Sequence, residues 1–113
     1  MEELEPPAAA VTAGDVERAA TDLRAHLQPT PLQYSRAFTD KARCHVHIKV
    51  ESIQPIRAFK VRGALNKLIR MPVRQRAAGV ITASAGNHGM GVAYAAAVFK
   101  TPATVFVVAT TST

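Results

Sequence analysis

The amino-acid sequence predicts an α/β fold, with a parallel sheet that carries helices on both faces and is incomplete. From Cys44 onward, segments with the apolar pattern of a strand alternate with segments whose apolar residues have helical spacing. Their order is strand, helix, strand, helix, strand. The last of these strands, residues 103–109, is apolar on both sides, as are strands that lie between two layers of helices. Three strands joined by two crossover helices leave a sheet edge unpaired, so we expect further strands from a partner or from a longer chain.

The first third of the chain predicts one helix between two irregular segments. Residues 1–11 are rich in Pro, Ala and Glu, which predicts a disordered lead. Thr12 and Asp15 have the spacing of a capping box, which marks the start of a helix. The apolar residues that follow at helical spacing are Val16, Ala20, Leu23 and Leu27. This helix must end before Pro29, and the prolines of residues 28–32 predict an extended loop of fixed shape.

The rest of the chain predicts three strands and two helices. Residues 44–50 alternate between apolar and polar side chains, which indicates the first strand. The helix after it ends at Pro72, and its apolar face consists of Ala64, Leu65, Leu68 and Ile69. The remaining elements are expected over residues 79–83 (strand), 87–99 (an Ala-rich helix) and 103–109 (strand).

Charge and composition argue against two kinds of partner. The 113 residues suit one soluble domain, and 14 Lys and Arg against 8 Asp and Glu give a net charge of +6. Basic residues gather between positions 57 and 76, but no aromatic residue beyond Phe59 is interleaved to stack on nucleic-acid bases, so we expect a solvated basic face. The longest apolar stretch, residues 92–99, is much shorter than the roughly 20 residues of a membrane-spanning helix. We therefore expect neither nucleic acid nor membrane as a partner.

The amino terminus and the cysteine content predict a cytoplasmic location. The first residues are acidic and include prolines, and they lack the basic and apolar regions of a secretory signal. A single cysteine, Cys44, forms no internal disulfide and suits a reducing compartment. Of Cys44, His45 and His47, only the two histidines share a face of the predicted strand, and two ligands are too few for a closed zinc site, so we expect surface histidines and no metal.

One segment with candidate chemistry, residues 51–64, follows the first predicted strand and is centred on Lys60. The amino end of a helix carries partial positive charge, so a lysine placed there is electrostatically unfavourable. In its neutral form a lysine amine is a nucleophile that can form a Schiff base with an aldehyde cofactor. On spacing alone, an ordinary solvated lysine is the simpler interpretation.

A second segment, residues 84–91, lies between a predicted strand and a predicted helix and contains three glycines. Glycines permit positive φ angles and close approach of a ligand, and the amides at the start of the helix would suit a phosphate or a carboxylate. A tight turn capped by Ser84 or Asn87 is the alternative interpretation. The glycine spacing matches neither the Walker loop nor the dinucleotide fingerprint, which disfavours nucleotide binding by those routes.

Together the two segments resemble the fold-type II pyridoxal-phosphate enzymes, whose fold is like that of tryptophan synthase beta. Within them the sequence is most similar to the threonine and serine dehydratases (ammonia-lyases) and their serine racemase relatives. The resemblance extends from Thr12 to Ala109 and includes residues 29–32 and 104–108. It implies that residues 12–113 are the amino-terminal part of a longer pyridoxal-phosphate-dependent lyase domain, which in its full-length form is a homo-oligomer.

The resemblance also implies a role for each residue of the two segments. Lys60 would hold pyridoxal 5'-phosphate and later act as the base at the substrate α-carbon, while Phe59 would pack beside the cofactor ring and Asn87 would hydrogen-bond its 3-hydroxyl oxygen. The backbone amides that would receive the substrate carboxylate are those of Ser84, Ala85, Gly86, Asn87 and His88. The implied reaction converts L-threonine or L-serine to a 2-oxo acid and ammonia.

Some features depart from the family pattern. Ala58 stands where the family usually has serine, and Met90 where glutamine is common. Ala85 stands where the racemases carry a second serine that acts as acid or base, which favours elimination over racemisation. The family's glycine-rich cup for the cofactor phosphate and its partner for the pyridine nitrogen lie beyond these residues. We therefore expect the isolated chain to be nearly inactive. The alternative function is a non-catalytic short form or regulatory chain that pairs with full-length subunits through its open sheet edge.

Overall fold

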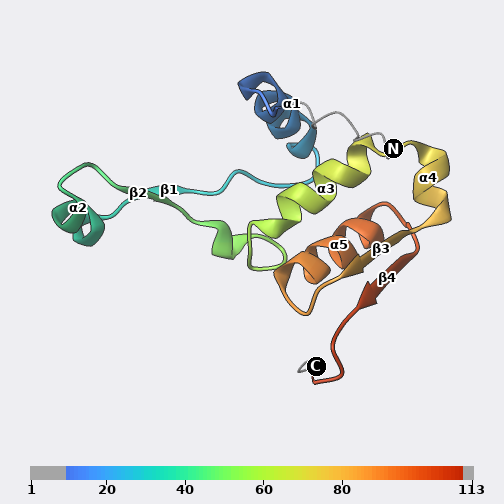
Figure 1. Cartoon of the computed structure of the whole chain (residues 1–113). Coiled ribbons are helices and arrows are strands. Elements are labelled where there is room, and N and C mark those ends of the chain that lie inside the picture. Colours follow the sequence, from blue (N-terminus) through green and yellow to red (C-terminus); the bar gives the residue numbers. More distant parts are fainter. Residues whose placement is uncertain (1–9, 111–113) are drawn as a thin grey trace, which may run out of the picture.

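The computed structural model describes residues 10–110, which form a helical body with a small parallel sheet and a projecting arm (Figure 1). Its elements are α1 (Ala13–Leu23), β1 (Leu32–Tyr34), α2 (Arg36–Ala42), β2 (His47–Lys49), the 3-10 helix η1 (Glu51–Ile53), α3 (Lys60–Arg70), α4 (Val73–Ala78), β3 (Val80–Ala83), α5 (Asn87–Val98) and β4 (Ala103–Phe106). Most of the predicted disordered lead lies outside the described residues. Ala10 and Val11, its last two residues, are exposed and belong to no helix or strand.

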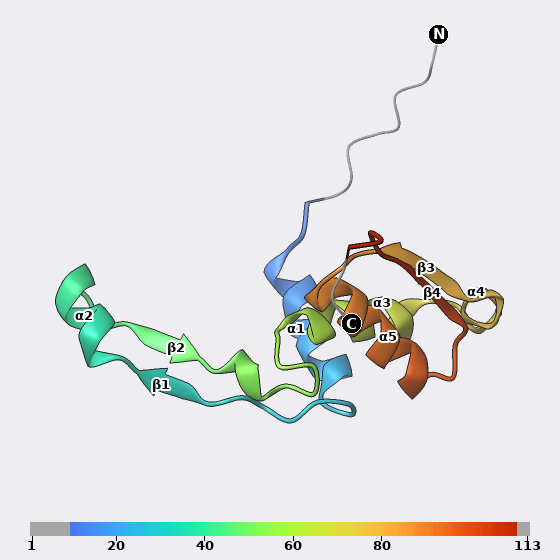
Figure 2. The ribbon, with the colours of Figure 1, turned by 90° about the horizontal axis from the view of Figure 1, so that it is seen from below.

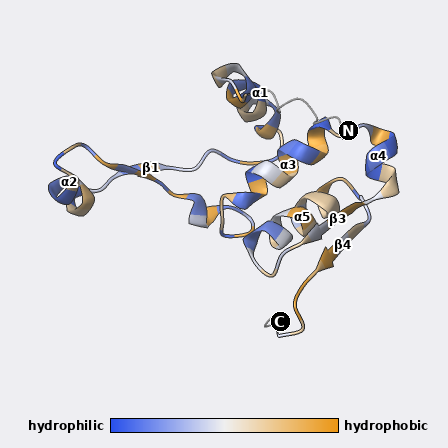
Figure 3. Cartoon of the chain, in the orientation of Figure 1, coloured by the Kyte–Doolittle hydropathy of each residue, from blue (hydrophilic) through white to orange (hydrophobic). Residues whose placement is uncertain are grey.

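The hydrophobic core lies where α3 meets α5 and α1. Val61 and Leu65 of α3 are fully buried, and the predicted apolar face of this helix is confirmed, with Ile69 packed at its margin. Colouring by hydropathy shows apolar and polar residues alternating along α3, as in an amphipathic helix (Figure 3). The other buried members of the core are Leu23, Leu27, Ile56, Ala58, Ala64, Leu68, Val92, Ala95 and Ala96. This core fixes the position of α3 relative to the start of α5.

Helix α1 begins with the predicted capping box. The Thr12 hydroxyl accepts a hydrogen bond from the Asp15 amide at 3.2 Å, and the Asp15 carboxylate accepts one from the Thr12 amide at 2.8 Å. The helix ends at Leu23, earlier than the limit at Pro29, although Leu27 is also buried and its amide donates to the Leu23 carbonyl. The apolar spacing therefore continues through a turn after the regular helix has ended.

The first predicted strand exists in shortened form, but its expected place in the parallel sheet is wrong. β2 pairs antiparallel with β1, with Tyr34 opposite His47, and β1 begins at Leu32, the last residue of the segment predicted as a loop. Alternating polarity is common to parallel and antiparallel strands, so it does not identify the partner strand. β2 pairs with β1 because the chain reverses its direction through the short helix α2 between them. The sequence patterns did not indicate this helix. β1, α2 and β2 form the arm, which projects from the body in both views (Figures 1 and 2).

The parallel sheet among the described residues consists of β3 and β4. Val80 lies opposite Ala103 and Ala83 opposite Phe106, which confirms a parallel pair joined by a crossover helix, α5. One face of the sheet packs against α5, whereas Ile81 and Phe106 on the other face are 75% and 60% exposed. Pro72 ends α3 as expected, and α4, which was not predicted, begins directly after it.

The described part of the chain contains no helix that is both long enough and apolar enough to cross a lipid bilayer.

Candidate active site

The fold places the starts of α3 and α5 side by side, and so joins the two segments that the sequence singled out. Lys60 is the first residue of α3, and Asn87 is the first residue of α5. A Cβ atom built on Gly91 would lie 3.1 Å from the carbonyl oxygen of Lys60 and 3.5 Å from Cβ of Ala64. The first turns of the two helices are therefore in close contact, and their positive helix ends converge on one side of the body.

Two of the three glycines of the second segment, Gly89 and Gly91, serve packing, whereas Gly86 has open space around it, and none of the three uses the positive φ that glycine permits. Among the described glycines, only Gly79 has a positive φ, of 98°. A Cβ on Gly89 would lie 2.7 Å from the Ser84 carbonyl oxygen and 3.1 Å from a methyl group of Val105, and Gly91 makes the contact with Lys60 described above. Glycine is thus required at these two positions because neighbouring segments of the chain pack too closely to leave room for a side chain.

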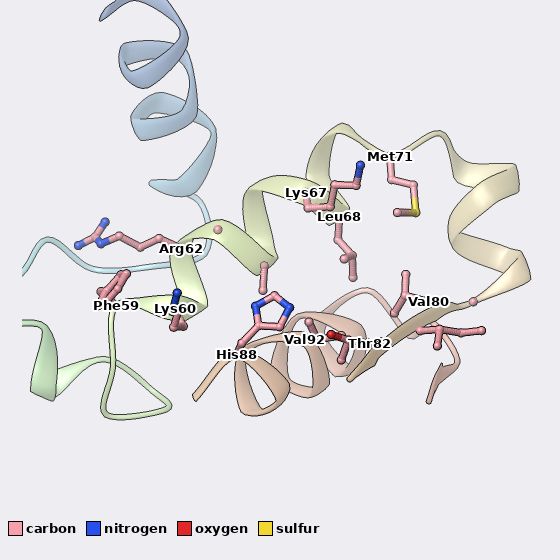
Figure 4. Close-up of a pocket in the computed structure, with 14 residues that line it drawn as sticks. Phe59, Lys60, Arg62, Lys67, Leu68, Met71, Val80, Thr82, His88 and Val92 are labelled. Atoms are coloured by element: carbon pink, nitrogen blue, oxygen red, sulfur yellow. The ribbon is translucent and has the colours of Figure 1, made fainter. Parts of the chain in front are cut away.

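A cavity of about 850 Å³ opens between α3, β3 and the first turn of α5. Lys60, Phe59 and His88 lie on its wall, and the Lys60 ammonium nitrogen is 5.1 Å from the centre of the Phe59 ring (Figure 4). Lys67 adds a further cation, whereas the charge of Arg62, which also lies on the wall, is paired with Glu51. No acidic residue of the described part of the chain lines the cavity. The cavity is therefore suited to an anionic ligand.

The turn before α5 lies next to this cavity but contributes little to its wall. Ser84, Ala85, Gly86 and Asn87 are absent from the lining, whereas His88 is part of it. The Ser84 hydroxyl accepts a hydrogen bond from the Gly86 amide at 3.2 Å, and no side chain caps α5. Ser84 therefore closes the turn before α5, but neither Ser84 nor Asn87 caps the helix itself, and the amides of Asn87 and His88 are available to an anion.

The positions that depart from the family pattern differ in their surroundings. Ala58 is buried in the core beside Ile56 and Val61, where a methyl group packs without an unpaired hydroxyl. Ala85 and Met90 are exposed at the start of α5. The side chain at position 58, two residues before Lys60, is thus part of the core.

Sequence analysis missed the ion pair between Glu51 and Arg62. Both guanidinium nitrogens involved donate to the carboxylate, Nε at 2.7 Å and an Nη at 2.8 Å, and the Thr30 hydroxyl donates at 2.6 Å. The hydrogen bonds from Arg62 lower the pKa of Glu51 to about 2, against the effect of partial burial. Opposite charges on the two sides of Lys60 were the only signal in the sequence, and no periodic pattern links residues so far apart.

The residues present fit the aldehyde end of pyridoxal phosphate. A primary amine is required to bind the aldehyde, and Lys60 provides one that forms no ion pair with any of the described residues. The cationic lining and the uncapped end of α5 suit the anionic groups of cofactor and substrate.

Comparisons with known proteins identify the family of the chain. Residues 23–113 match the family described as pyridoxal-phosphate dependent enzyme. The chain is 40% identical over 101 residues to a biosynthetic L-threonine dehydratase of Lactococcus lactis, covering 89% of this chain and 24% of that protein. It is 43% identical over 91 residues to an L-threonine ammonia-lyase of Geobacter sulfurreducens, covering 80% and 23%.

Solved structures give the same result for the fold. The serine racemase of Dictyostelium discoideum superposes with a TM-score of 0.84 and 28% identity, covering 91% of this chain and 34% of the racemase. This confirms the fold-type II architecture. The chain spans about a quarter of the length of the two curated relatives named above. By the family match and by these likenesses, the chain belongs to the pyridoxal-phosphate-dependent enzymes.

Proposed function

We propose that the chain is the amino-terminal part of an enzyme that dehydrates and deaminates L-threonine or L-serine to a 2-oxo acid and ammonia. The observation that carries the proposal is that Lys60 and His88, a residue of the uncapped first turn of α5, line the same cavity, while the Lys60 backbone packs against Gly91. The named functions of the two curated relatives, threonine dehydratase and threonine ammonia-lyase, support the same reaction.

The proposed mechanism assigns a task to each side chain and amide. Bound pyridoxal phosphate supplies an electron sink for the electron pair left at the substrate α-carbon. Lys60 would hold the cofactor through its aldehyde carbon, and its Nζ would take the proton from the substrate α-carbon. Phe59 would pack beside the cofactor ring, and Asn87 would donate or accept a hydrogen bond at the cofactor's 3-hydroxyl oxygen.

The substrate is oriented by backbone amides. Of the amides of residues 84–88, that of Ser84 donates to the Phe106 carbonyl at 3.0 Å and that of Gly86 to the Ser84 hydroxyl at 3.2 Å. The amides of Ala85, Asn87 and His88 would therefore receive the substrate carboxylate, since an anion at a helix start is held both by N–H donors and by the helix dipole. The carboxylate would then fix the α-carbon relative to Lys60, and departure of the β-hydroxyl would complete the elimination. Ala85 has no hydroxyl to return a proton on the opposite face, which favours elimination over racemisation.

The assignment of Lys60 is tested by chemical trapping. We would incubate the chain with pyridoxal 5'-phosphate, reduce with borohydride and locate the adduct by peptide mass spectrometry. We expect the adduct on Lys60, with loss of the visible absorption band in Lys60→Ala. Lys67→Ala is the matched control, because Lys67 lies on the same helix and the same cavity wall. An adduct concentrated on any other lysine contradicts the proposal.

The reaction is tested in a chimera in which residues 10–110 replace the matching segment of the Lactococcus lactis dehydratase. We expect 2-oxobutanoate from threonine or pyruvate from serine, and a fall of at least about a thousandfold in kcat for the chimera with Lys60→Ala. In the isolated chain we expect little 2-oxo acid. Robust turnover by the isolated chain would contradict this second expectation.

A second candidate function is a non-catalytic chain that pairs with full-length subunits. The exposed apolar side chains of Ile81 and Phe106, on one face of the sheet, favour it. Gel filtration with and without the full-length relative distinguishes the two proposals, because only the second requires mixed oligomers.

A further inference from the structure

We propose that Glu51 is a positioning residue for Lys60. In this proposal the Glu51 carboxylate joins the loop before β1 to the first turn of α3, and so holds the segment that carries Phe59 and Lys60 against the cavity. The inference rests on the proposed role of Lys60 and deepens it, because it names what keeps that amine in place.

The Glu51 carboxylate accepts hydrogen bonds on both of its oxygens. Oε1 accepts from the Thr30 hydroxyl at 2.6 Å and from an Nη of Arg62 at 2.8 Å. Oε2 accepts from Nε of Arg62 at 2.7 Å and from the Gln54 side-chain amide at 3.2 Å. We call these four residues the Glu51 network. A bidentate arginine pair with two further donors fixes the carboxylate in one orientation.

The Glu51 network is shielded from water on most sides. Thr30 and Gln54 are 8% and 3% exposed, and the side chains of Glu51 and Arg62 are 17% and 30% exposed. Lys49 adds a second tie, because its ammonium donates to the Thr30 carbonyl at 3.2 Å. An ion pair so placed is less screened by solvent than one on the surface, and removal of one partner leaves the other with unsatisfied hydrogen-bonding groups.

Lys60 lies between two fixed points of the first turn of α3. On one side Gly91 of α5 approaches its carbonyl group, and on the other Arg62, two residues further along, is held by Glu51. The Arg62 amide also donates to the Phe59 carbonyl at 3.0 Å. Figure 4 shows Arg62 and Lys60 leaving this turn in different directions, so that Arg62 can hold the turn without covering the Lys60 amine.

The segment between Glu51 and Lys60 requires such a tether. Arg57 in this segment has a φ of 58°, a left-handed conformation that is costly for a residue other than glycine. Unfavourable backbone conformations persist where surrounding contacts determine them. The Glu51 network links the two ends of this segment, because Glu51 precedes it and Arg62, eleven residues later in sequence, follows it.

The test compares how selectively one reagent labels two lysines of the same helix. The full chain is treated with limiting pyridoxal 5'-phosphate and borohydride, and the ratio of adduct on Lys60 to adduct on Lys67 is measured by mass spectrometry. Glu51→Gln is expected to lower this ratio about fivefold, because it removes the charge that orients Arg62. Asp22→Asn is the matched control. It breaks the pair of Asp22 with Arg70 at the far end of α3, whose N–O distance is 2.8 Å, and should leave the ratio unchanged.

A ratio is chosen because general loosening of the fold changes the labelling of both lysines. Thr30→Val, which removes one donor and keeps the shape, should lower the ratio about twofold and serves as the second variant if Glu51→Gln does not fold. The proposal is overturned if the ratio is unchanged in the folded Glu51 and Thr30 variants, or if Asp22→Asn lowers it equally.

A readout without cofactor separates this proposal from the proposed function. If Lys60 of the unmodified chain is labelled no more than Lys67, the proposed function fails. Hydrogen exchange of the amides of residues 54–62 then tests whether the Glu51 network holds this segment. Faster exchange in Glu51→Gln than in Asp22→Asn supports it, whereas equal rates overturn it.

Discussion

Arg57 has a left-handed backbone close to the lysine on which the proposed chemistry depends, and its φ of 58° predicts a specific effect of glycine. The left-handed conformation costs a non-glycine residue roughly 1–2 kcal/mol, while glycine loses about 0.5–1 kcal/mol more backbone entropy on folding. Arg57→Gly should therefore raise the free energy of unfolding by about 0.5 kcal/mol, measured by urea denaturation. Arg57→Ala keeps the conformational cost and is the control. Equal stabilisation by alanine would show that the arginine side chain, and not the backbone, is responsible.

Glu51 predicts a loss of stability in acid. Its pKa in the folded chain is lowered from 4.5 to about 2, chiefly by the hydrogen bonds from Arg62. Because the folded pKa lies below the unfolded one, the stabilisation is complete above about pH 4.5 and is lost as the pH falls toward 2. The free energy of unfolding should thus fall over this window, and fall less steeply in Glu51→Gln.

Asp15 provides the control for this pH dependence. Hydrogen bonds from Thr12, with help from Arg18, lower its pKa from 3.8 to about 2, so its own contribution is lost only below about pH 3.8. Asp15→Asn should flatten the profile between pH 4.5 and 3.8 less than Glu51→Gln does, because the unfolded pKa of Asp15 is lower. If it flattens that part as much as Glu51→Gln does, the assignment of the upper part to Glu51 is incorrect.

At the scale of elements, α3 and α5 make opposite predictions for the same substitution. Gly63 in α3 has open space where a Cβ would lie, so Gly63→Ala should raise the free energy of unfolding by about 1 kcal/mol through helix propensity. A Cβ atom built on Gly89 in α5 would lie only 2.7 Å from the Ser84 carbonyl oxygen. Gly89→Ala should therefore lower the free energy of unfolding by about 1–3 kcal/mol. Urea unfolding of both variants measures these effects. If Gly89→Ala were stabilising, the backbone of the turn before α5 would have to move easily to accommodate the added methyl group.

Local sequence predicted those elements whose signals lie within one turn or one strand. The capping box of Thr12 and Asp15, the stop at Pro72 and the apolar face of α3 depend on neighbours within a few residues, and all three are confirmed. The short helices α2 and α4 were missed, since they have only 7 and 6 residues and bury none of them, so no apolar stripe marks them.

For the whole molecule, the position of the core predicts where truncation is costly. Leu65 is fully buried between α3 and its neighbours, so Leu65→Ala should lower the free energy of unfolding by about 3 kcal/mol. Ile81 is 75% exposed on the open face of the sheet, and Ile81→Ala should change it by less than about 0.5 kcal/mol. Thermal or urea unfolding gives both values. A large loss in Ile81→Ala would indicate that this face is covered in solution.

The distribution of basic residues is also clearer at this scale. Arg62 and Arg70 pair with Glu51 and Asp22, and Arg76 donates to the Leu68 carbonyl. These three cations of the basic segment are thus engaged within the chain. Binding to nucleic acid, if tested, should be weak, and any affinity observed should fall steeply with salt.

The sequence by itself determined the two segments to which the proposed chemistry is assigned, because a lysine at a helix start and a glycine-containing turn before a helix are local features. It also determined the membership of the fold-type II family, whose two motifs lie in continuous segments. Tertiary structure alone decided that β2 pairs with β1, that Gly89 and Gly91 are packing residues, and that Glu51 holds Arg62. Each of these depends on residues distant in sequence or on the space between elements, which no local period or spacing records.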